Sequence, residues 1–240
     1  QTDILNETPA QDLFWRNVHH SLGSLPIEEA IKKWASLAPV AQALALSEEE
    51  QNEKLYELVV EANSSEIKRT VIDALGANKY LPAFHLIINA LSDDEPNVRR
   101  TAITALGSLG DAKAIPHIIK FFDDSVASVK FATISALVKI STDEALQFLV
   151  EKYTPSPKLT RMDILRELAK SNNPETLNKL TIFLKNEVNE DILRVSIFTF
   201  LQQENSMSQQ QRLTLIQDAI DNNEVLQKVV KEVLLELKQK

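Results

Sequence analysis

The stretch DDEPNVRRTAITALGSLGDAKAIP, from Asp93 to Pro116, determines the architecture of this chain. Its first part carries an apolar stripe at helical spacing, which predicts a helix from about Pro96 to Leu106. Within residues 107–111, glycine is expected to end the first helix and polar residues to begin the next one. A second helix is therefore expected from about 113 to 122. The stripe of the first helix consists of Val98, Ala102, Ile103 and Leu106.

The same pattern recurs along the chain at a fixed interval, which we call the repeat step. One step takes segment 67–76 onto 98–107, and the next takes 98–107 onto 129–137. Further steps, of which the last two are slightly longer, reach weaker copies near 165–168, 198–201 and 231–234. One helical pair cannot bury both of its stripes, so such units stack into arrays. The sequence therefore predicts an all-α fold, an α-solenoid of helical pairs.

Three motifs of the second unit carry a family resemblance: DDEPNVRR at 93–100, ALGSLGD at 105–111 and AIP at 114–116. Together they resemble the bacterial HEAT-like repeat first associated with phycobilin lyases. The likeness is closest in 93–122 and fades beyond 154. The family includes a di-iron hydroxylase with repeated His-Glu pairs, and no histidine of this chain is followed by glutamate. The resemblance implies armadillo-like stacking of helices, and it leaves a lyase-like or other protein-modifying activity on a bound partner as an alternative function.

Residues 1–46 show no repeat, and they contain both tryptophans. We expect them to form an N-terminal helical cap over a single repeat array at 47–240, because an uncovered end would expose an apolar face. Capping boxes at Thr8–Gln11 and Ser47–Glu50 predict helix starts at both places.

Composition excludes several classes of site and partner. The 240 residues have a net charge of −8, which opposes binding to nucleic acid. The chain has no cysteine, so thiolate chemistry and disulfides are excluded, and its four glycines are fewer than a phosphate-cradling enzyme usually needs. No apolar run is long enough to form a membrane-spanning segment. Gln1 and the missing cysteines fit an exported, processed protein and a cytoplasmic protein with a trimmed start equally well.

A column of cations is the most regular polar feature of the sequence. Asp93 and Asp124 each lie six residues before one of these cations, in the preceding loop. We therefore expect a structural ladder, in which each cation bonds loop carboxylates or carbonyls of its own or the adjacent repeat. A basic stripe for an anionic partner is the alternative. The column comprises Lys68, Arg99, Lys130, Arg161 and Arg194.

His85 and His117 lie at nearly matching places in successive second helices, where the next unit carries Phe148. A position that accepts either ring type favours packing over metal ligation, so we expect neither a metal nor another cofactor. Paired acids elsewhere lie at loops and helix starts, where capping explains them.

These features favour a non-catalytic scaffold or adaptor that binds a protein or peptide partner. We expect the second helices, near 82–91, 114–122 and 145–152, to converge and line the inner face. Phe121 is the best anchor there, because aromatic side chains dominate interface energies. The predicted binding residues are Asn89, Lys120, Phe121, Glu151 and Lys152.

Overall fold

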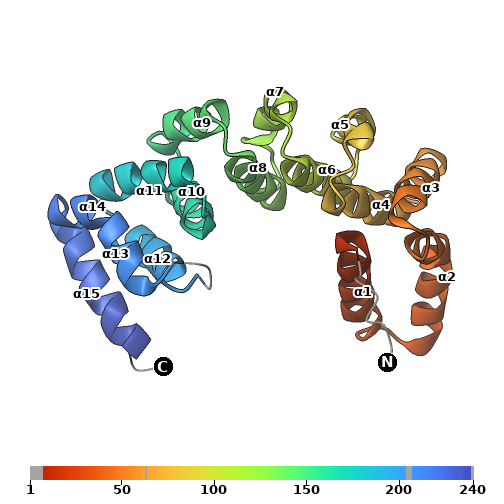
Figure 1. The fold of residues 1–240 in the computed structure, drawn as a ribbon, viewed down its shortest axis with the longest axis horizontal. Coiled ribbons are helices and arrows are strands. Elements are labelled where there is room, and N and C mark those ends of the chain that lie inside the picture. Colours follow the sequence, from red (N-terminus) through yellow and green to blue (C-terminus); the bar gives the residue numbers. More distant parts are fainter. Residues whose placement is uncertain (1–7, 63, 204–206, 239–240) are drawn as a thin grey trace. The chain divides into compact units, whose positions relative to one another are not determined.

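The computed structural model describes residues 8–62, 64–203 and 207–238, and these segments contain helices and no strand (Figure 1). The predicted all-α solenoid of helical pairs is confirmed. The chain divides into two compact units, residues 1–136 and 137–240, which are described separately. The predicted boundary after residue 46 lies inside unit 1 and stays a prediction. No described helix is long and apolar enough to cross a membrane.

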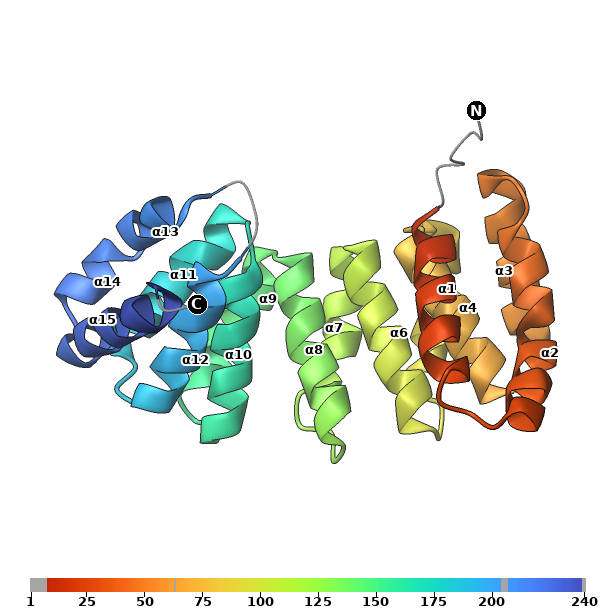
Figure 2. The ribbon, with the colours of Figure 1, turned by 90° about the horizontal axis from the view of Figure 1, so that it is seen from below.

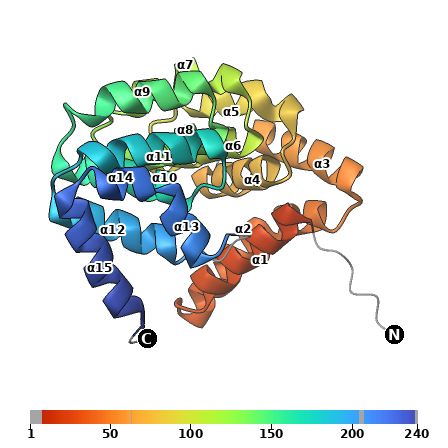
Figure 3. The same ribbon diagram turned by 60° about the vertical axis from the view of Figure 1, so that its left-hand side comes forward.

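Unit 1 contains two layers of helices. The first layer holds α1, α4, α6 and α8, and the second layer holds α3, α5 and α7, on the other side of α4 and α6 (Figures 1 and 3). Three short 3-10 segments, η1 to η3, occupy 81–83, 112–114 and 119–121. The helices are α1 (Pro9–Leu22), α2 (Ile27–Leu44), α3 (Glu48–Glu61), α4 (Ser65–Ala77), α5 (Phe84–Ala90), α6 (Pro96–Leu109), α7 (Ile115–Ile118) and α8 (Ala127–Ile140), whose last turn belongs to unit 2.

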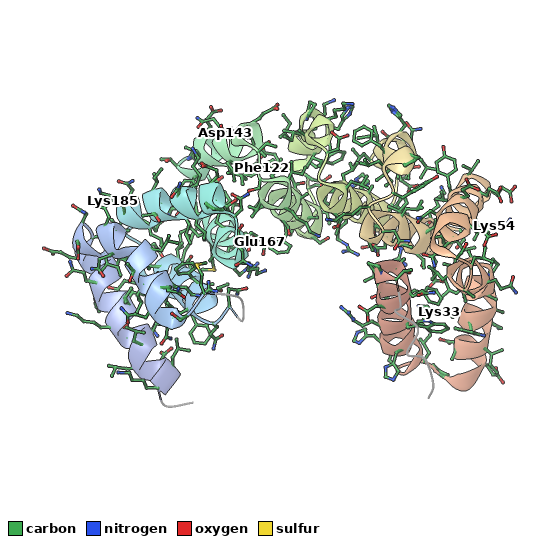
Figure 4. The ribbon with its side chains drawn as sticks, in the orientation of Figure 1. Lys33, Lys54, Phe122, Asp143, Glu167 and Lys185 are labelled. Atoms are coloured by element: carbon green, nitrogen blue, oxygen red, sulfur yellow. The ribbon has the colours of Figure 1, made fainter. Side chains whose placement is uncertain are left out.

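The predicted cap is joined to the repeats by polar contacts as well as by packing. The backbone N–H of Ala10 donates to Asn78 Oδ1 at 3.1 Å, and Asn78 Nδ2 donates to Gln51 Oε1 at 2.8 Å. Lys33 of α2 is labelled in Figure 4, and its Nζ lies 3.1 Å from Glu66 Oε1 of α4. These contacts hold α1 and α2 against α3 and α4.

The two capping boxes differ in outcome. Thr8 accepts from the N–H of Gln11, and the Gln11 side chain accepts from the N–H of Thr8, as expected. At the start of α3, however, the Ser47 hydroxyl donates to the Glu50 carboxylate at 2.6 Å and makes no cap to the backbone. The helix begins at the predicted place, but without the predicted capping bonds.

The repeat step is followed closely in the backbone of unit 1. One step takes the start of α4, residue 65, to the start of α6, residue 96, and the start of η1, residue 81, to that of η2, residue 112. The same side chains fill the core at each step, because Ile72, Ile103 and Ile134 are all at most 1% exposed. A residue of one repeat can therefore be compared directly with the residue one step later.

Glycines bring the first-layer helices of unit 1 close together. A Cβ added at Gly76 would lie 2.7 Å from Ala105 Cβ, and one added at Gly107 would lie 2.7 Å from Ala136 Cα. Gly107 is therefore not the helix stop that the sequence predicted. The helix α6 runs on to Leu109 and ends at Gly110, whose φ of 72° is the left-handed conformation that glycine accepts.

The second helix predicted over 113–122 is broken into η2, α7 and η3. Pro116 explains the first break. It has no N–H to donate to residue 112, and its ring would clash with that carbonyl in a continuous α-helix. The predicted position of the segment is right, and its predicted regularity is wrong.

Unit 2 repeats the two-layer arrangement with less regular spacing. α10, α12 and α15 pack side by side, and α9, α11 and α14 form the second layer (Figure 2). First-layer helices start at 158, 190 and 224, so the spacing is longer than in unit 1. The bounds are α9 (Asp143–Tyr153), α10 (Lys158–Lys170), α11 (Pro174–Asn186), α12 (Glu190–Leu201), α13 (Gln209–Leu215), α14 (Gln217–Asp221) and α15 (Glu224–Lys238).

Candidate functional site

The cations of unit 1 contact acidic loop residues. Lys68 Nζ lies 3.4 Å from Asp93 Oδ2, and Arg99 Nη2 lies 3.6 Å from Asp124 Oδ2. The two pairs are equivalent, because both the cation and the acid of the second pair lie one repeat step after those of the first. Arg99 also donates to the carbonyls of Asp93 and Asp94, each at 3.0 Å, and so links its own loop to the next one. A lysine in the place of Arg99 could not supply these separate donors from one planar group.

The column is interrupted at Lys130. The residue one repeat step after Asp124 is Pro155, and within the described segments the Lys130 side chain makes no ion pair or hydrogen bond. In unit 2, Arg161 Nη1 lies 3.5 Å from Glu187 Oε2, whereas Arg194 pairs with Glu232 and Glu236 of α15. Four of the five cations thus face acids. Their purely structural role stays a prediction.

Glu187 is the centre of a buried polar cluster in unit 2. Its carboxylate accepts from the Tyr153 hydroxyl at 2.5 Å, and from the N–H groups of Val188 at 3.0 Å and Asn189 at 2.9 Å. Burial, followed by the hydrogen bond to Glu187, raises the pKa of Tyr153 above its ordinary value. The sequence reading missed Glu187, although it follows Arg161 at the spacing of the unit 1 ion pairs to within one residue.

The predicted binding residues occupy two register positions on the second-layer helices. Asn89, Lys120 and Glu151 follow one another at the repeat step, and all three are exposed. Phe121 and Lys152, which occupy the next position, are half-buried. Glu151 accepts from Gln147 at 3.2 Å. The structure therefore places these side chains at the surface in a repeating arrangement, and their role in binding stays a prediction.

The expected convergence of the second helices is not what unit 1 shows. The close approaches at Gly76 and Gly107 join first-layer helices, whereas α5 and α7 share few contacts. The reason is the sequence of the first helices, because glycine against alanine lets two backbones approach more closely than larger side chains would. Asn89, Lys120 and Phe121 therefore lie on the more widely spaced layer of this unit.

One of these residues, Asn89, lies at a pocket of about 330 Å³ in unit 1. The pocket is bounded by α3, α4, α5 and the loop after α5. Its apolar wall includes Val59 and Ile72, which are 8% and 1% exposed. Lys68 and Asp93, the ion pair of the cation column, form a charged wall. The complete lining is Val59, Lys68, Ile72, Leu86, Asn89, Ala90, Ser92 and Asp93.

The pocket therefore combines an apolar interior with uncharged polar groups and one neutralised ion pair. This composition suits a small apolar group that is joined to hydrogen-bonding atoms.

Sequence comparison decides the family. The model of HEAT repeats matches residues 52–137 and 84–164, which include the pocket and most of the cation column. Residues 52–164 of the chain are HEAT repeats. The resemblance noted from the motifs at 93–116 is thereby confirmed. No curated protein sequence matches the chain.

Three solved structures align with most of the chain at low sequence identity and with TM-scores below 0.5. Escherichia coli YibA is 17% identical over 93% of this chain and 85% of its own, with a TM-score of 0.46. Human deoxyhypusine hydroxylase is 14% identical over 97% and 98%, with a TM-score of 0.32. The CpcE–CpcF complex of phycocyanin lyase from Nostoc sp. PCC7120 is 16% identical over 88% and 94%, with a TM-score of 0.38. At these values none of the three carries an argument about activity.

The histidines of the HEAT array are not in matching register. At the repeat step His85 corresponds to Pro116, and His117 corresponds to Leu86. The His85 ring lies edge-on to Phe84, with 5.5 Å between ring centroids. No group of three or more potential metal ligands occurs among residues that the structure describes. The expectation that no metal is needed stays a prediction.

Unit 1 also exposes an aromatic pair that the sequence reading did not anticipate. Trp15 of α1 and Trp34 of α2 are stacked, with ring centroids 5.8 Å apart and an interplanar angle of 27°. They are 44% and 39% exposed, although tryptophan is usually well buried. Their spacing along the chain gave no signal, because the two helices that bring them together show no repeat.

Proposed function

We propose that this protein is a non-catalytic scaffold or adaptor that binds a protein or peptide partner through the second-layer helices of its HEAT repeats. The observation that carries the proposal is a contrast between two kinds of repeated position. Core positions keep the same chemistry at each step, as with Ile72, Ile103 and Ile134. The exposed position on the second helices changes from Asn89 to Lys120 to Glu151.

Such a surface keeps the backbone constant while it changes charge and polarity from one repeat to the next. A partner that contacts both Asn89 and Lys120 in unit 1 would therefore meet a defined order of side chains. The half-buried ring of Phe121 adds an apolar contact beside the polar side chain of Lys120. A buried aromatic contact supplies much of the free energy of binding in typical interfaces.

A protein partner is also favoured over nucleic acid. Lys68, Arg99 and Arg161 each face an acidic side chain at 3.4–3.6 Å, so these three cations do not present unneutralised charge to phosphates. The net charge of −8 acts in the same direction.

The test uses affinity capture of the full chain from source cells, with quantitative comparison of surface variants. We expect Lys120→Glu with Phe121→Ala in unit 1, or Glu151→Lys with Lys152→Glu in unit 2, to reduce partner recovery at least tenfold. Far-ultraviolet circular dichroism should stay unchanged. The matched control changes Thr104 and Ser135 of the first layer to Glu. If the control abolishes capture and the second-layer variants do not, the proposed face is wrong.

A further inference from the structure

The pocket in unit 1 occurs where one repeat lacks a side chain that the next repeat has. At the repeat step the charged wall and one apolar residue are preserved, since Lys68 corresponds to Arg99, Asp93 to Asp124 and Ile72 to Ile103. The apolar residues Val59 and Leu86 correspond instead to Ala90 and His117. The largest difference is at Ala90, a methyl group in the pocket lining, which corresponds to Phe121.

The backbones on which these two residues stand are equivalent. The starts of α4 and α6 are separated by one repeat step, as are those of η1 and η2, which precede the helical segments carrying Ala90 and Phe121. Phe121 is half-buried rather than projecting freely into solvent. The second repeat thus carries a phenyl ring, that of Phe121, at this register position. At the same position the first repeat has only the methyl group of Ala90, and an open pocket lies beside it.

From this comparison we propose that the pocket binds an aromatic side chain of the protein partner, an inference that rests on the proposed scaffold function. The missing ring of this repeat would then be provided in trans. The partner's ring lies against Val59 and Ile72, both nearly inaccessible to water, and burial of aromatic surface drives its binding.

The polar lining suits the atoms that adjoin such a side chain in a peptide. Asn89 and Ser92 carry uncharged donors and acceptors, which can hydrogen-bond the amides that flank the aromatic residue. Lys68 is paired with Asp93 at 3.4 Å, so the wall is locally neutral and does not require a charged ligand. Its ammonium group can still approach the face of a bound ring.

The size of the pocket limits the occupant. Its volume of about 330 Å³ lies at the lower end of the range for ligand pockets, roughly 300–1,000 Å³. One aromatic side chain with its flanking amides fits this volume better than a multi-ring cofactor does.

The first experiment uses N-acetyl-4-fluorophenylalanine N-methylamide as the probe and the full chain as the receptor. Binding is followed by ¹⁹F line broadening, and a compound of this size is expected to bind with a Kd of about 1 mM. Ala90→Phe should weaken binding at least tenfold, because the new ring occupies the pocket. We expect this variant to fold, since the next repeat carries phenylalanine at the same position. Ala90→Leu is the second variant if it does not.

Thr104→Phe is the matched control, since it adds a phenylalanine at an exposed position of α6 and should leave binding unchanged. Unchanged broadening with folded Ala90→Phe, or with Ala90→Leu if only that variant folds, overturns the proposal. So does an absence of broadening with the wild-type protein. Equal displacement of the probe by N-acetyl-leucine N-methylamide overturns the aromatic preference.

The capture assay separates this proposal from the scaffold function. If Ala90→Phe retains the partners that the second-layer variants lose, the pocket assignment is wrong and the scaffold function stands. If the wild-type protein captures no partner but binds the probe selectively, the scaffold function fails and the pocket's aromatic preference stands.

Discussion

Replacing Gly107 with alanine should destabilise unit 1, although alanine is the better helix former. The new methyl group would lie 2.7 Å from Ala136 Cα and 2.8 Å from Ala136 Cβ. Favourable carbon–carbon contacts lie at about 3.5–4.0 Å, so α6 and α8 would have to separate by about 1 Å. The backbone of α8 cannot rotate away as a flexible side chain could.

Two opposing terms set the magnitude. Alanine in a helix interior is favoured over glycine by about 1 kcal/mol. Overpacking a close contact costs about 1–3 kcal/mol, and the separation of the helices also weakens the neighbouring packing. We expect a net loss of about 1–2 kcal/mol, which corresponds to a fall in Tm of roughly 2–8 °C for a chain of this size.

The assay is thermal and urea unfolding followed by circular dichroism. Thr104→Ala is the matched control, because it lies on the exposed face of the same helix and should change stability by less than about 0.5 kcal/mol. A Gly107→Ala protein that is as stable as the wild type would show that α6 and α8 do not approach as closely as described.

Three further substitutions test other contacts. Arg99→Ala should lower the free energy of unfolding by about 1–3 kcal/mol in urea titrations because it removes bonds to two carbonyls, whereas Lys130→Ala at the matching position should change it little. Tyr153→Phe removes one hydrogen bond to a charged group without creating a cavity, and calorimetry should show a loss of about 1.5–3 kcal/mol; an unchanged Tm would contradict this. Burial raises the pKa of Asp73 from 3.8 to about 6, against the opposing effect of Arg100 and Arg69. The stabilisation linked to the protonated acid is therefore full below pH 3.8 and is lost as the pH rises through about 6. Asp73→Asn should exceed the wild type in stability by about 1–3 kcal/mol at pH 7.5, and by much less near pH 4; a gap independent of pH would refute the assignment.

The sequence predicted the repeat because its period is carried by core side chains, which must recur if identical helices are to stack. It did not predict how the helices end. Gly107 and Gly110 both looked like stops, and only the contact with Ala136 shows that Gly107 serves close packing instead. The break at Pro116 follows from proline chemistry, but the helical period of the neighbouring apolar residues concealed it.

The candidate site was predictable only in part. The positions of Asn89 and Lys120 followed from the register, and both are exposed. The pocket could not be predicted from the register, because it depends on a small side chain at Ala90 and on walls from three helices. Glu187 was missed for a related reason, since the partners of its carboxylate, Tyr153 and Arg161, come from different helices.

The stacked tryptophans also determine what a spectroscopic experiment on this chain can detect. Trp15 and Trp34 are its only tryptophans; Trp15 lies in α1 and Trp34 in α2. Emission excited at wavelengths that tyrosine does not absorb therefore reports on those two helices of unit 1. Circular dichroism, in contrast, averages over every helix. If the segment 1–46 opens before the repeats do, the fluorescence transition will precede the ellipticity transition, and the wild-type protein will reveal this without truncation or labelling.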